Sequence, residues 1–126
     1  MIMEQSKRDK ILFRTFTGLL TLQMLLSAGM YFLKHEVALE AFVRLGFPPF
    51  IIYPLGIAKI LGIAAIVSGK STFLAKLAYA GFFYNMLLAI SAHLVVGDGV
   101  ETIPSSTALL WVIGSYYFNA GIRKEE

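Results

Sequence analysis

The chain of 126 residues contains no cysteine and few charged side chains. Without cysteine, disulfides, thiol nucleophiles, dithiol redox chemistry and Cys-ligated metal centres are all excluded. Charged residues make up 15% and hydrophobic residues 57% of the sequence, whereas a soluble domain carries about 25% charged residues. These proportions favour a membrane protein, with residues 1–126 forming a single domain.

Several motifs that would identify a common function are also missing. The sequence has no phosphate-cradling loop, nucleophile elbow or pair of carboxylates within an apolar segment, so an autonomous hydrolase or kinase is not expected. The net charge is +3, and the basic residues lie at the ends of apolar segments, so no nucleic-acid partner is expected. The two histidines, His35 and His93, lack a recognised ligand spacing, so neither a metal nor a haem is expected.

Four apolar segments are present, and a membrane span needs about 20 such residues. They predict spans at about residues 11–33, 50–67, 73–96 and 104–120. The first is longer than the apolar core of a signal peptide, about 7–15 residues, so we expect it to be retained. Short second and third loops require antiparallel neighbours. The predicted fold is an all-α, integral membrane four-helix up-down bundle. Ser71 or Thr72 is expected to cap the third helix and Thr102 the fourth.

Residues 35–45, between the first two spans, predict a short interfacial helix. One face is apolar, whereas Glu40 and Arg44 lie one turn apart on another face and are expected to pair. A connector lying on the outer surface is the simpler interpretation, and a lid over the bundle is the alternative.

Lysine and arginine are distributed unevenly among the loops. Eight of the eleven lie in or beside the N-terminal tail, the second loop and the C-terminal tail, whereas Lys34 and Arg44 lie on the opposite side. Because positively charged loops stay in the cytoplasm, both termini are expected there, and a dual topology is not.

The eleventh basic residue, Lys59, stands within the apolar residues 51–67. A lysine at membrane depth costs roughly 2.5–3.5 kcal/mol on insertion scales, so such a residue marks a functional-site candidate. The helix rise of about 1.5 Å per residue predicts that Gln23, Asn85 and Ser115 share its layer near the midplane. Gly56 and Gly62 flank Lys59 and leave room for a neighbouring helix or a ligand.

We therefore predict a ligand-binding site formed by Lys59, Asn85, Gln23 and His93, without a catalytic residue. A lysine there can bind an anionic or carbonyl-bearing lipophile, such as a quinone head group, by a charge-assisted hydrogen bond. The simpler role for Gln23, Asn85 and Ser115 is to hydrogen-bond helices together, at about 0.6 kcal/mol each.

The remaining polar and aromatic residues have local roles in this interpretation. His93 is expected to bond locally, capping its helix or reaching Asp98. Tyr31 and the other tyrosines, with the single tryptophan, are assigned to an interfacial belt or to the core.

Several short motifs together resemble the DoxX-like family. They are Ala-Phe-x-x-Leu-Gly-Phe-Pro at 41–48, Ile-Ala-Lys-Ile-Leu-Gly at 57–62, Leu-Ala-Tyr-Ala-Gly-Phe-Phe at 77–83, Ser-Ala-His-Leu at 91–94 and Gly-Asp-Gly at 97–99. The resemblance implies a four-helix protein of the bacterial cytoplasmic membrane. Its better-studied relatives are small subunits of thiosulfate- or quinol-linked oxidoreductases, and more distant ones resemble membrane chaperones or assembly factors. The main branch usually has glutamate at the position of Lys59, so the intramembrane charge is reversed here.

Three functions follow from these patterns. The first is a non-autonomous accessory or binding subunit with a lipophile (quinone-like) pocket near Lys59, which serves other membrane subunits in the bilayer. The second is a membrane assembly factor or chaperone, and the third is a small transporter of anions or lipophiles. An enzymatic role is expected only as part of a quinone-linked oxidoreductase, and the cofactor is not identified by the sequence.

Overall fold

The computed structural model describes residues 2–123, and this part of the chain contains helices joined by short turns, without a strand. The elements, in order, are α1 (Ile2–Leu33), α2 (His35–Leu45), the short 3-10 helix η1 (Pro49–Ile51), α3 (Ile52–Ser68), α4 (Thr72–Val95), the 3-10 helix η2 (Gly99–Glu101), α5 (Thr102–Tyr117) and α6 (Ala120–Arg123). An all-helical fold is therefore confirmed for the described residues.

Three segments are long and apolar enough to cross a membrane: Lys7–Leu33, Pro49–Ser68 and Thr72–Val95. The fourth predicted span, residues 104–120, is not among these three segments. α5 has 16 residues and ends at Tyr117, before the expected boundary at 120. The Asn119 side-chain oxygen accepts a hydrogen bond from the backbone N–H of Ile122 at 3.3 Å, which starts the separate short helix α6.

Local sequence explains most helix ends. Gly69 adopts a left-handed backbone (φ +62°) after α3, a conformation that costs glycine little. The Ser71 hydroxyl then accepts a hydrogen bond from the N–H of Leu74 at 3.2 Å, which confirms Ser71 as a cap of α4. Thr102 as a cap of α5 is wrong. The chain continues from η2 directly into α5, and the Thr102 hydroxyl donates backwards to the carbonyl of Gly99.

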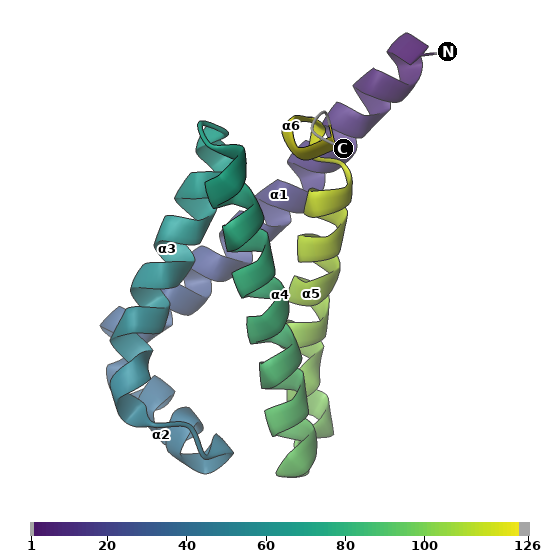
Figure 1. Ribbon diagram of the computed structural model, residues 1–126. Helices are drawn as coiled ribbons and strands as arrows, with labels where there is room; N and C mark the ends of the chain where they lie inside the picture. Colours follow the sequence, from purple (N-terminus) through teal and green to yellow (C-terminus); the bar gives the residue numbers. More distant parts are fainter. Residues whose placement is uncertain (1, 124–126) are drawn as a thin grey trace.

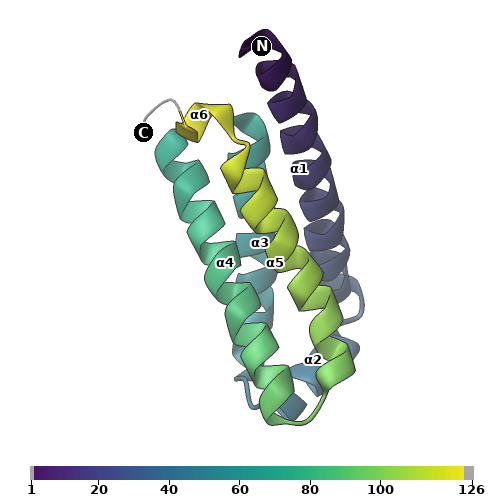
Figure 2. The ribbon, with the colours of Figure 1, turned by 90° about the vertical axis from the view of Figure 1, so that its right-hand side faces the viewer.

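The four longest helices form a ring of neighbours. α1 contacts α3 and α5, and α4 also contacts α3 and α5. Figure 1 shows α1 crossing obliquely, with the N-terminus, the α3–α4 turn and α6 at one end of the molecule. Helix α2 and the α4–α5 connection lie at the other end, as the rotated view in Figure 2 also shows. The ring thus places the two described chain ends on the same side.

The core and the outer surface of this ring are both apolar. Leu20, Met24, Ile63 and Phe82 belong to the buried cluster between the helices. Large apolar side chains also point outward, including Leu22, Leu26, Leu61, Leu77 and Leu88, each more than half exposed. A surface this apolar is unusual for a soluble monomer and fits a lipid environment.

A cluster of polar side chains joins α1, α4 and α5 away from Lys59. The fully buried Ser115 hydroxyl lies 2.7 Å from the hydroxyls of both Thr17 and Tyr79, and Asn119 donates to the Tyr79 hydroxyl at 3.2 Å. The prediction that Ser115 shares a layer with Lys59 is therefore wrong.

The depth estimate failed because it took the ends of the first and fourth helices as level. Gln23 donates a hydrogen bond to the carbonyl of Pro104 at 2.7 Å, so α5 begins opposite Gln23, well before α1 ends at Leu33. Thr17, rather than Gln23, therefore lies opposite Ser115.

The close contact of α5 with α1 predicts a stability difference between two glycine substitutions. A Cβ added at Gly114 would lie 2.6 Å from the Phe16 ring, whereas one at Gly81 in α4 meets nothing within 4 Å. We expect Gly114→Ala to destabilise the protein by about 1–3 kcal/mol through overpacking. Gly81→Ala should be neutral or stabilising by up to about 1 kcal/mol. Thermal unfolding in detergent compares the two, and equal effects would contradict the contact.

Candidate functional site

Lys59 is buried in α3, with 6% of its surface exposed. Its Nζ donates hydrogen bonds to the Ser27 hydroxyl at 2.6 Å and to the Tyr31 hydroxyl at 3.1 Å, both on α1. The Nζ also lies 4.2 Å from the centroid of the Tyr31 ring, within cation–π range. Among residues 7–120, whose side chains the structure describes, no carboxylate pairs with this ammonium group. Lys59 is therefore held by neutral hydroxyls alone.

The partners of Lys59 differ from those that the sequence predicted. The sequence assigned no role to Ser27, and it assigned Tyr31 to the belt or core. Residues 23, 27 and 31 follow one another at four-residue intervals, which places all three on one face of α1. That spacing was the signal that could have identified Tyr31.

A cavity of about 370 Å³ adjoins Lys59. Its walls come from all five helices α1 to α5, and the four predicted site residues Gln23, Lys59, Asn85 and His93 all line it. No aspartate or glutamate is among its lining residues. The fold thus brings the predicted residues to one cavity, and their binding of a ligand stays a prediction.

The side-chain amides of Gln23 and Asn85, which both line the cavity, differ in their hydrogen bonds. Gln23 bonds the first turns of α5, through the Pro104 carbonyl at 2.7 Å and, more weakly, the Thr107 hydroxyl at 3.5 Å. This is the helix-joining role considered from the sequence. Asn85 is half-buried and has no hydrogen-bond partner among the described residues, so its amide remains available to the cavity.

The glycines beside Lys59 admit neighbouring side chains. A Cβ on Gly56 would lie 2.9 Å from the Phe32 ring, and one on Gly62 would lie 2.7 Å from the Phe82 ring. Of the two occupants expected from the sequence, aromatic rings from the neighbouring helices α1 and α4 therefore fill this space.

The two histidines are not brought together at the cavity. The ring of His35 stacks on that of Tyr53, with 4.7 Å between centroids and an interplanar angle of 10°, and it does not line the cavity. His93 lines the cavity, and its Nδ1 lies 3.7 Å from Asp98 Oδ2. The two side chains are neighbours, as expected, but the expected hydrogen bond is not formed.

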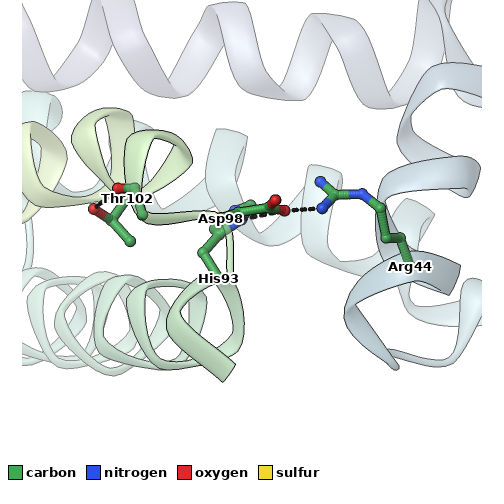
Figure 3. A network of polar contacts seen from close by, with 5 residues as sticks. Arg44, His93, Asp98 and Thr102 are labelled. Atoms are coloured by element: carbon green, nitrogen blue, oxygen red, sulfur yellow. Dashed lines mark hydrogen bonds and ion pairs between the residues drawn. The ribbon is translucent and has the colours of Figure 1, made fainter. Parts of the chain in front are cut away.

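Asp98 also connects α2 to the segment between α4 and α5. The Arg44 guanidinium at the end of α2 forms an ion pair with the Asp98 carboxylate in the α4–α5 connection (Figure 3). The prediction that Arg44 pairs with Glu40 is wrong, because Arg44 instead reaches Asp98 in the α4–α5 connection. Ala38 and Phe42 of α2 are buried and line the cavity, so α2 is part of its wall as well as a connector.

This ion pair predicts a measurable coupling between Arg44 and Asp98. The two side chains are 49% and 27% exposed, so a double-mutant cycle with Arg44→Gln and Asp98→Asn should give about 0.2–1 kcal/mol. Both single variants should also increase hydrogen exchange of the α2 amides. Lys34→Gln, which removes a cation before α2, is the control. A coupling of zero with unchanged exchange would show that the pair does not hold α2.

Buried helix contacts, an apolar outer surface and three segments of membrane-spanning length among the described residues define a helical, multi-pass membrane protein with a partly open cavity. A family model described as the DoxX-like family matches residues 15–115, most of the chain. The chain belongs to the DoxX-like family, which confirms the resemblance read from the sequence. Comparisons with curated proteins and with solved structures gave no match.

Proposed function

We propose that this DoxX-like protein spans the bacterial inner membrane four times, with both termini in the cytoplasm. The ring of α1, α3, α4 and α5 supports the count, because α5 packs in it like the other three. Glu101 directly precedes Thr102, so η2 and α5 together give an uninterrupted helical segment of residues 99–117. The basic loops and tails lie at the end of the molecule that carries both termini and the α3–α4 turn (Figure 1), and the positive-inside rule assigns that end to the cytoplasm.

The absence of native cysteine makes the orientation directly testable. We expect a Ser68→Cys variant, at the end of α3, to be protected from a membrane-impermeant maleimide in intact cells. A Val100→Cys variant, in η2, should be labelled in the same cells, because it lies at the opposite end. Labelling of both sites only after lysis, or the reversed pattern, would contradict the proposed orientation.

We further propose that the protein is a binding or accessory subunit whose cavity holds a lipophile next to Lys59, with a quinone-like head group as the example that the family implies. The observation that carries this proposal is an ammonium group buried at a cavity wall without a counter-charge. Such a group is costly to insert into a membrane, and a ligand that accepts its hydrogen bond offsets part of that cost.

The cavity has the character of a small-molecule site. Its volume of about 370 Å³ lies within the range of about 300–1,000 Å³ for ligand pockets. Most of its lining is apolar, including Met24, Phe42, Leu55 and Met86. A few polar groups among apolar walls orient a lipophilic ligand, and here those groups converge from α1, α3 and α4.

Helix α2 acts in this proposal as the lid that the sequence left as an alternative. It contributes Ala38 and Phe42 to the cavity wall. It is also held to the α4–α5 connection by the Arg44–Asp98 pair. A lipophile would therefore enter or leave when this half-exposed pair opens.

The binding function predicts a ligand that depends on Lys59. Native mass spectrometry of gently purified wild-type protein should show a bound lipophile, and Lys59→Met should lose it. Lys70→Met, an exposed lysine in the α3–α4 turn, should keep it. Ligand-free spectra of the wild type would contradict the pocket. A protein partner that co-purifies in place of a lipophile would favour the assembly-factor function.

A further inference from the structure

We infer that the ligand of the Lys59 cavity is a single-chain amphiphile with a carboxylate head. This inference rests on the proposed binding function and narrows it, because a lipophile with a neutral head group, such as a quinone, would satisfy the proposed function equally well. Three properties of the described site select the carboxylate: its charge, its hydrogen-bond donors and its size.

The charge of the site is unbalanced. Lys59 is buried, and no aspartate or glutamate lines the cavity. The carboxylate of Asp98, which lies beside the lining residue His93, is already engaged by Arg44. A buried cation without a partner is costly, and a neutral carbonyl supplies a hydrogen-bond acceptor but no negative charge. An anionic head group supplies both.

The hydrogen-bonding groups around Lys59 form a set of donors. The ammonium has three N–H donors, and two of them reach Ser27 and Tyr31. Each hydroxyl accepts from Lys59, so each keeps its own O–H to donate, and neither has an acceptor among the described residues. The third ammonium N–H and the two hydroxyls thus offer three donors. An ionised carboxylate has two oxygens that only accept, so it matches this set.

The remainder of the cavity suits a single apolar chain. Its volume of about 370 Å³ lies at the lower end of the range for small-molecule pockets, which leaves room for one alkyl chain beside the head group. Unbranched and flexible side chains, among them Met24, Met30 and Met86, line it. Methionine adapts its shape to an irregular apolar partner, as a flexible alkyl chain would require.

The test compares ligands that differ only in charge on the full-length protein in detergent. Labelled laurate is the probe, and its methyl ester, which has the same chain and a neutral head, is the matched control together with a short-chain quinone. We expect wild-type protein to bind laurate roughly ten- to a hundredfold more tightly than the ester, because a charge-assisted hydrogen bond is lost with the charge.

Variants distinguish laurate that is bound at Lys59 from laurate that is dissolved in the detergent. Lys59→Met should reduce laurate affinity by a similar factor, whereas Lys59→Arg should keep most of it and Lys70→Met should leave it unchanged. Circular dichroism of each variant checks that the helices are intact, and the ligand comparison on the wild type is independent of any variant.

Two results would overturn the inference in distinguishable ways. Equal affinity for laurate, its methyl ester and the quinone, each reduced by Lys59→Met, would remove the charge selection and leave the lipophile pocket standing. Failure of all three to bind in a manner that depends on Lys59 would remove both the inference and the proposed function.

Discussion

The site depends on one buried ammonium group, Lys59, held from α1 by hydroxyls rather than by a carboxylate. The hydrogen bonds to Ser27 and Tyr31 join α3 to α1, and glycines on either side of Lys59 admit the rings of Phe32 and Phe82. These contacts keep a positive charge at a cavity wall without neutralising it. Had α1 supplied an acid in their place, the ion pair would be complete, and the cavity would lack its strongest attraction for a ligand.

The rest of the fold shapes the cavity around that charge. The hydroxyl cluster of Thr17, Tyr79 and Ser115 joins α1, α4 and α5 in a separate part of the ring, where these side chains are buried and hydrogen-bonded to one another. Towards the other end, α2 packs against α1 and α3 and contributes to the wall. The cavity therefore lies at the end with the long α1–α3 connection, and the tight packing lies towards the short α3–α4 turn.

The sequence predicted the helices well because hydropathy and helix ends are local properties. The bounds of residues 35–45 and the cap at Ser71 agree with the structure, and the family was recognised from short motifs. Two errors are local, the Thr102 cap and the end of the fourth helix, because the chain runs from η2 directly into α5 and the separate helix α6 begins at Ala120. The other errors concern relations between helices. Ser115 was placed beside Lys59, and Arg44 was paired with Glu40, because neither the tilt and stagger of α1 nor the position of Asp98 is encoded in a local pattern. Tyr31 was missed because an aromatic residue near a helix end has a common interfacial role.

The central claim is that Lys59 contacts the ligand directly. Solid-state nuclear magnetic resonance on the protein in lipid bilayers can measure the dipolar coupling between isotope-labelled lysine Nζ atoms and an isotope-labelled carboxyl carbon of laurate. The account predicts a dipolar coupling as strong as a direct hydrogen bond between the two groups requires. This coupling should be present in the wild type and in Lys70→Met and absent in Lys59→Met. A bound laurate without that coupling, or with a coupling that persists in Lys59→Met, would contradict it.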